Sequence, residues 1–132
     1  MDQRKMREAV FQMCFALEHG TEDMLALIQK ELKINKTDAR SALARATAVM
    51  EKAPEMDVLI EQTATEYALD RIPKAELTIL RLGAFELLFD DAIPSKVAVS
   101  EAIRLCRKFA TKESASFINA VLDAHIPEKS TT

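Results

Sequence analysis

The chain is poor in the residues that favour sheets and sharp turns. Its 132 residues include 2 glycines, 4 prolines, 1 tyrosine and no tryptophan. Strands are enriched in aromatic and β-branched residues and tight turns in glycine, so this composition argues against a sheet-rich fold. Hydrophobic residues make up 48% and charged residues 30%, which is typical of a folded globular domain and argues against a disordered chain.

Groups that carry catalysis or bind metal are also scarce. His19 and His125 are the only histidines and stand without companions, while Cys14 and Cys106 each lie among apolar residues. We interpret both cysteines as buried free thiols rather than as a disulfide or a metal pair. The sequence has no glycine-rich phosphate loop and no nucleophile with an evident base. We therefore expect neither an enzyme nor a bound cofactor or metal.

Membrane and targeting signals are missing from the sequence. No stretch approaches the roughly 18 apolar residues of a membrane span, and no basic start leads into an apolar run. Together with the free thiols, this predicts a cytoplasmic location. The net charge of −3 gives no overall attraction to nucleic acid, so any RNA binding requires a local basic cluster.

What the sequence does contain is a helical period over nearly its whole length. The pattern predicts seven helices, at about 3–19, 22–33, 38–52, 55–68, 73–89, 95–110 and 113–124. We expect Gly20 to end the first helix in a left-handed conformation and Thr37 to cap the third. Pro73 and Pro94 mark breaks before new helices. The length suits a single all-α domain, and the loops are too short to separate independent domains.

The first predicted helix places two aromatic rings on a charged face. Its inward stripe is predicted to consist of Met6, Val10, Met13 and Leu17. Phe11 and Phe15 point nearly opposite, beside Arg4 and Arg7. Either another helix covers the two rings, or they form an exposed partner surface, because aromatic and arginine side chains are enriched at interface hot spots.

The fifth predicted helix is apolar on almost every side, so we expect it at the centre of the domain. One of its apolar stripes consists of Ile79, Leu82, Phe85 and Phe89. Its charged exceptions are Glu76, Arg81 and Glu86. We interpret Arg81 as one half of a structural ion pair.

The last two predicted helices carry candidate RNA-binding groups. The outer face of the sixth helix holds the strongest basic cluster of the chain, opposed only by Glu101. This cluster comprises Lys96, Arg104, Arg107 and Lys108, followed by Lys112. It is either a solvated face or a phosphate-binding one. Phe117 lies at the edge of the apolar stripe of the seventh helix, close in angle to Glu113. Its ring either packs under a neighbour or forms a platform on which a base stacks.

Four segments carry a specific motif pattern, namely "RKMREAVFQMCFALE", "ILRLGAFELL", "IPSKVAVSEAI" and "SFINAVLD". In this order and spacing they resemble the NusB family of bacterial transcription antitermination factors. The match covers roughly residues 4–19 and 70–123, whereas residues 20–69 fit only by helical pattern. The resemblance implies a single RNA-binding domain over residues 1–132, built as a compact all-α bundle of two packed sub-bundles at about 3–53 and 54–126.

The resemblance also implies a function without catalysis. NusB-like proteins pair with NusE, a ribosomal protein of the small subunit. The pair binds single-stranded boxA RNA, notably in ribosomal RNA transcripts, and with other Nus factors it suppresses premature termination by the transcription elongation complex. Two alternatives are a helical protein-interaction module without RNA binding and an accessory domain of a ribosomal RNA methyltransferase. The end of the chain at residue 132 disfavours the second alternative.

The resemblance assigns roles to individual residues. The arginine-rich, RNA-contacting start of the family maps to Arg4, Lys5 and Arg7. Two further RNA-binding positions map to Glu113 and Phe117. We add Lys108 and Lys112 to the RNA-binding set from the basic face of the sixth helix. The NusE-facing set consists of Phe11, Phe15, Glu76 and Glu86. Exposed rings at Phe11 and Phe15 also allow a homodimer.

Overall fold

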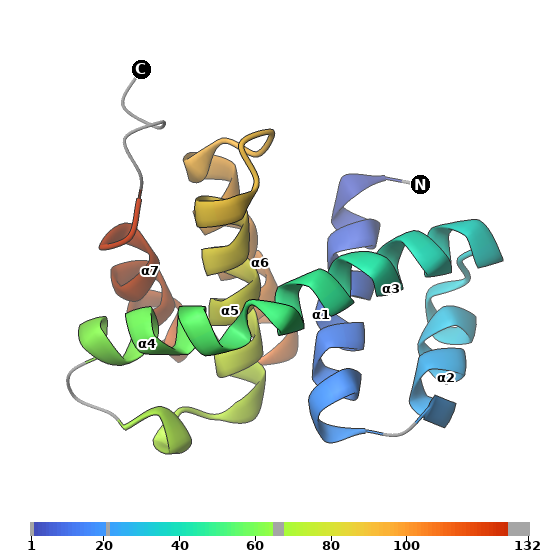
Figure 1. Ribbon diagram of the computed structural model, residues 1–132, viewed down its shortest axis with the longest axis horizontal. Helices are drawn as coiled ribbons and strands as arrows, with labels where there is room; N and C mark the ends of the chain where they lie inside the picture. The colour runs from blue at the N-terminus through green and yellow to red at the C-terminus, as the bar shows by residue number, and fades with distance from the viewer. Residues whose placement is uncertain (1, 21, 65–67, 127–132) are drawn as a thin grey trace. The chain divides into compact units, whose positions relative to one another are not determined.

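A computed structural model describes residues 2–20, 22–64 and 68–126 (Figure 1). Over these residues the chain forms seven α-helices and two short 3₁₀ helices, and the described part contains no strand. The all-α class is therefore confirmed. The chain divides into two compact units, Met1–Glu51 and Lys52–Thr132, which are described separately below.

The first unit contains α1 (Gln3–His19), α2 (Glu22–Leu32) and α3 (Lys36–Glu51). Helix α1 contacts both α3 and α2. Ala42 and Ala46 of α3 are completely buried, and the Cys14 sulfur of α1 lies 3.8 Å from the carbonyl oxygen of Ala46. Small residues on α3 therefore let the backbones of α1 and α3 approach closely.

Two predictions about helix caps in this unit need correction, namely the conformation of Gly20 and the identity of the residue that caps α3. Gly20 is the C-cap of α1, as predicted, but its φ of −117° is not left-handed, so its backbone conformation does not itself require glycine. The left-handed residue is Lys33, with φ 55°, at the end of α2. Helix α3 begins at Lys36 because the Asn35 side chain accepts a 2.7 Å hydrogen bond from the Asp38 N–H. Asn35 therefore caps this helix in place of Thr37.

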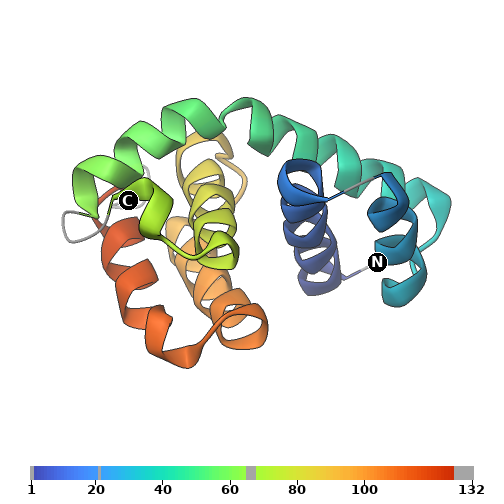
Figure 2. The same ribbon diagram turned by 90° about the horizontal axis from the view of Figure 1, so that it is seen from below.

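The second unit contains α4 (Ala53–Thr63), η1 (Leu69–Arg71), α5 (Lys74–Phe89), α6 (Ser95–Phe109), η2 (Lys112–Ser114) and α7 (Ala115–Asp123). Helix α5 contacts α4, α6 and α7, and Figures 1 and 2 show it among them. A Cβ at Gly83 would lie 2.8 Å from a Leu122 methyl group, so this glycine lets α7 approach α5. The prediction of α5 as the central helix is confirmed within this unit.

Several predicted boundaries and faces in the second unit need correction. Helix α4 ends at Thr63 instead of about residue 68, and Tyr67, which the pattern placed on it, lies outside the described residues. Helix α7 begins at Ala115 because the Thr111 side chain caps a separate 3₁₀ turn, η2. Phe89 is 43% exposed, and the Lys52 ammonium lies 5.1 Å from its ring centroid. The breaks at Pro73 and Pro94 are confirmed, since each directly precedes a helix.

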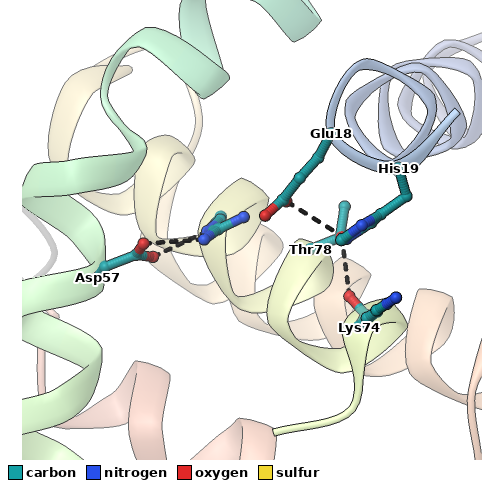
Figure 3. Close-up of polar contacts among 6 residues, drawn as sticks. Glu18, His19, Asp57, Lys74 and Thr78 are labelled. Carbon is teal, nitrogen blue, oxygen red and sulfur yellow. Dashed lines mark hydrogen bonds and ion pairs between the residues drawn. The ribbon is translucent and has the colours of Figure 1, made fainter. Parts of the chain in front are cut away.

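Arg81 on α5 forms a buried ion pair with Asp57 on α4. The Arg81 Nε and Nη2 groups each donate a 2.8 Å hydrogen bond to a different oxygen of the Asp57 carboxylate (Figure 3). The two side chains are only 8% and 19% exposed. The predicted structural role of Arg81 is confirmed, because this bidentate pair ties the central helix to α4.

Candidate RNA and protein interface

The predicted RNA-contacting residues of the first unit lie at the start of α1. Arg4 is exposed, and Lys5 and Arg7 are half-buried. The Asp2 side chain caps the helix by accepting a 2.7 Å hydrogen bond from the Lys5 N–H, but the first turn itself contains no acidic residue. Cations at the positive end of a helix do not add to its stability. The helix dipole therefore gives no stabilisation that would account for cations at this end of α1.

Of the two alternatives for the rings on α1, Phe11 follows the first, because it is only 4% exposed and is therefore covered by its neighbours. Phe15 is half-buried, and its ring centroid lies 4.9 Å from that of His19. Leu17, predicted to face inward, is 43% exposed. Helix α1 contacts two helices of its own unit, so its buried arc is wider than the single stripe that the sequence pattern assumes. Phe15 therefore offers more surface to a partner than Phe11 does.

In the second unit, the end of α6 and the turn η2 carry the predicted basic side chains. Lys108 and Lys112 are exposed, as are Lys96 and Arg107. The Lys108 ammonium lies 5.5 Å from the ring centroid of Phe109. Arg104 does not belong to this exposed cluster, because it is half-buried and donates a 2.9 Å hydrogen bond to Glu101 on the same helix.

A chain of hydrogen bonds fixes the corner between α6 and α7. The Cys106 thiol donates to the carbonyl oxygen of Thr111 at 3.0 Å. The Thr111 and Ser114 hydroxyl oxygens lie 2.7 Å apart, and the Ser114 hydroxyl donates to the Glu76 carboxylate on α5. These contacts hold η2 against the start of the central helix.

A pocket of about 350 Å³ lies beside this corner. It is lined by Arg71, Ile72, Pro73, Glu76, Glu113, Ser114 and Phe117. Phe117 is half-buried, as its position at the border of the α7 stripe predicts, and Glu113 is exposed. The pocket therefore brings together Glu113 and Phe117, predicted to bind RNA, and Glu76, predicted to bind NusE.

The two glutamates that the sequence assigns to the protein partner are both buried. Glu76 is 8% exposed and Glu86 is 3% exposed. Glu76 lines the pocket, whereas Glu86 does not. Direct contact with a partner is therefore easier for Glu76 than for Glu86.

Burial raises the pKa of the Cys106 thiol above its usual range, and this effect exceeds that of the hydrogen bond to Thr111, which acts in the opposite direction. The thiolate is the reactive form, so we expect Cys106 to react with iodoacetamide at pH 8 at least about tenfold more slowly than a free cysteine. In a Cys14→Ala variant Cys106 is the remaining cysteine, so mass spectrometry of that variant measures the rate of Cys106 alkylation. The control is the alkylation rate of the same variant unfolded in urea. Equal rates in the folded and unfolded chain would contradict the assignment.

The part of the chain that the structure describes gives no sign of a metal centre. No group of three or more His, Cys, Asp or Glu side chains is placed there to hold an ion. No helix among the same residues is both long enough and apolar enough to span a membrane.

Comparison with known proteins identifies the family. The sequence model of the NusB family matches residues 4–126. The chain belongs to the NusB family. The transcription antitermination protein NusB of Agathobacter rectalis is 37% identical over 128 residues, covering 92% of this chain and 97% of the relative. That of Natranaerobius thermophilus is 37% identical over 132 residues, covering 93% of each.

Solved NusB structures share the fold. T. maritima NusB matches with a TM-score of 0.80 at 29% identity, covering 99% of this chain and 97% of that one. A crystal structure of the antitermination factors NusB and NusE in complex with double-stranded RNA matches with a TM-score of 0.78 at 23% identity, covering 94% and 95%. The second likeness shows the fold alone.

Arg71 and Ser114 line the pocket, but neither stands in the quoted NusB-like segments or in the predicted sites. Arg71 lies in the 3₁₀ turn η1, three residues before the start of α5. No periodic pattern marks either residue, so only the folded chain shows that they belong to the candidate site.

Proposed function

We propose that this chain, a transcription antitermination protein of the NusB family, binds RNA together with NusE. The observation that carries the proposal is the pocket of the second unit. There the proposed RNA-binding residues Glu113 and Phe117 lie beside Glu76, the proposed NusE-binding residue. Residues that the resemblance assigns to two different ligands thus line a single pocket of the folded chain.

The RNA side of the proposal rests on basic residues and one ring. Arg4, Lys5 and Arg7 at the start of α1, and Lys108 and Lys112 near the end of α6, supply charge for phosphate groups. Phe117 supplies a ring on which an unpaired base can stack. This combination fits single-stranded RNA better than a regular duplex, in which the bases are already stacked on one another.

The protein side of the proposal rests on Phe15 and Glu76. Phe15 is half-buried and Glu76 lines the pocket, so both offer atoms to a partner. Phe11 and Glu86 are buried, and each would act indirectly, by supporting the partner-binding residue of its own unit. A solved structure of the same fold contains NusB and NusE in complex with double-stranded RNA, which supports NusE and RNA as the partners.

We extend the proposal to larger assemblies. The chain would join the transcription elongation complex through other Nus factors, without catalysing a reaction. Phe15 and the exposed Leu17 at the end of α1 would also allow a homodimer. If NusE uses the same surface, light scattering will show a dimer that dissociates when NusE is added.

The test is a binding titration with fluorescently labelled boxA-like RNA, offered as a single strand and as a duplex. We expect the chain mixed with NusE to bind the single strand at least about tenfold more tightly than either protein alone, because two charged surfaces then contact one strand. If the chain binds NusE but does not change the affinity for RNA, the alternative function, a protein-interaction module without RNA binding, is supported instead. No binding to either would overturn the proposal.

A further inference from the structure

We propose that the outer face of α6 docks an acidic segment of a protein of the transcription elongation complex other than NusE. The α6 face consists of Lys96, Val97, Ser100 and Arg107, all of which are exposed. None of these residues lines the pocket, and none is assigned to RNA or NusE. The inference rests on the proposed function, in which the chain joins the elongation complex, and adds the surface that the chain uses there.

One side of α6 is covered by its own unit, and the other side is exposed. The helix contacts α5, α7 and η2, and Figure 2 shows it beside α5 and α7. Its buried side includes Ala102 and Leu105, which are 3% and 1% exposed. A helix turns about 100° per residue, so Lys96, Ser100 and Arg107 lie within about 40° of one another on the opposite side. With a rise of about 1.5 Å per residue, they form a row about 16 Å long.

The two cations of this row lack an acidic partner among the described residues. Lys96 and Arg107 are exposed and form no ion pair or side-chain hydrogen bond there. The acidic residue of α6 is Glu101, which is only 9% exposed and accepts a 2.9 Å hydrogen bond from Arg104. The α6 face is therefore a local positive area on a chain with a net charge of −3, and it attracts a partner that presents carboxylates.

Val97 adds an apolar element to the α6 face. It is 42% exposed and directly follows Lys96 in the sequence. A single exposed valine is common on protein surfaces, but an apolar contact bordered by charged groups is the arrangement of a protein interface with its core and polar rim. Covering Val97 removes apolar surface from water, so the face favours a segment that presents an apolar side chain beside its carboxylates.

Single-stranded RNA also carries negative charge, but none of the described residues of the α6 face is aromatic. Proteins that bind single strands combine cations with aromatic side chains on which the bases stack. The aromatic residue of α6 is Phe109, which is half-buried and lies about 160° around the helix from Arg107. Lys108, assigned above to RNA, lies about 100° from Arg107. A protein segment is therefore the occupant that the α6 face favours, with RNA on a neighbouring side of the helix.

The first test is photo-crosslinking in the assembled complex. The photoreactive residue p-benzoylphenylalanine replaces Ser100, and the full chain is assembled with NusE, boxA-like RNA and the other Nus factors on an elongation complex. Mass spectrometry identifies the molecule that is crosslinked. We expect a peptide of net negative charge from a protein other than NusE. The same photoreactive residue in place of Gln62, which is exposed on α4, measures the background.

Charge reversal measures how much the α6 face contributes to affinity. Lys96→Glu with Arg107→Glu should weaken binding to the elongation complex at least about tenfold, because each reversal replaces an attraction with a repulsion. Val97→Ser should weaken it about threefold without a change of charge. The control, Lys30→Glu with Lys36→Glu, makes the same change in net charge on exposed residues of the first unit and should keep the affinity within about twofold.

These affinities are measured by fluorescence anisotropy of the labelled chain with NusE. The elongation complex carries a transcript without boxA, so that tethering through RNA does not mask the protein contact. Replacing the acidic residues of the crosslinked segment with lysine should restore binding of the charge-reversed chain and weaken binding of the wild type. Such an exchange identifies the two surfaces as partners, which a general effect of charge would not do.

Four results would overturn docking at the α6 face. They are a crosslink from position 100 to RNA, a crosslink to NusE, no crosslink above background, and equal affinity of the charge-reversed and wild-type chains for the elongation complex. Unchanged affinity of the charge-reversed chain for NusE, within about twofold, shows that its fold is intact. If the wild-type chain binds NusE and boxA-like RNA while any of the four results is obtained, the proposed function stands and only the docking face is lost.

Discussion

Replacing Asp57 with alanine is expected to lower the free energy of unfolding by about 3 kcal/mol. The substitution leaves the Arg81 guanidinium, whose side chain is 8% exposed, without the carboxylate that accepts two of its hydrogen bonds. Removing one partner of a buried pair costs more than the pair itself contributes, because the remaining charge stays in a poorly solvated place. Urea denaturation followed by circular dichroism measures the loss.

The matched control for this prediction lies on the same helix. Glu55 is exposed and pairs with Lys52 at 3.5 Å on the surface, so Glu55→Ala should change stability by about 0.5 kcal/mol or less. The double variant Asp57→Leu with Arg81→Met removes both charges and should be more stable than Asp57→Ala. If Asp57→Ala proves as mild as Glu55→Ala, the ion pair does not tie α5 to α4 energetically.

Helix positions could be predicted from the sequence wherever a proline directly precedes a long segment with helical periodicity of apolar residues. Helix α5 is an example, because Pro73 directly precedes it and its residues are apolar on nearly all sides. Caps were harder to predict, because neighbouring residues compete for the same role. Asn35 and Thr37 are both good caps, and the choice depends on which side chain reaches a free N–H, as Asn35 does with Asp38.

Burial was predicted less well, because a helical wheel assumes a single covered face. Leu17, expected to face inward, is 43% exposed, whereas Phe11, whose position the pattern left open, is only 4% exposed. Contacts of α1 with both α2 and α3 broaden the covered arc. A sequence pattern gives the period of a helix, whereas the number of neighbours that surround it is a property of the tertiary structure.

The pocket could not be predicted from the sequence, because it too depends on the tertiary structure. Ser114 and Glu76 are 38 residues apart, and their hydrogen bond forms only when η2 packs against the start of α5. The resemblance to the NusB family named Glu76, Glu113 and Phe117, but it placed them with different ligands. Their meeting in one pocket, with Arg71 at its wall, follows from the fold alone.

Replacing Arg4, Lys5 and Arg7 together with alanine is expected to weaken binding to boxA-like RNA about 100-fold at 0.1 M salt. Each phosphate contact on single-stranded nucleic acid contributes about 0.7 to the slope of log K against log salt, so three contacts contribute about 2. With a slope of 2, lowering the salt concentration from 1 M to 0.1 M strengthens RNA binding by about 100-fold, and the alanine variant should lack this gain. The measurement is a salt titration of RNA affinity for both chains, in the presence of NusE.

The salt slope separates charge from structure in this experiment. A variant with Arg4→Lys, Lys5→Arg and Arg7→Lys keeps every charge and should keep the wild-type slope, whereas the alanine variant should lose about 2 from it. The start of α1 contributes no acidic residue to its first turn, so removing these cations also takes away an unfavourable interaction with the helix dipole. Urea denaturation of the alanine variant, followed by circular dichroism, must give a free energy of unfolding close to that of the wild type, so that a loss of affinity is not due to unfolding. If the alanine variant keeps the wild-type salt slope, Arg4, Lys5 and Arg7 do not contact RNA phosphates. Lys108 and Lys112 would then be the next residues to replace.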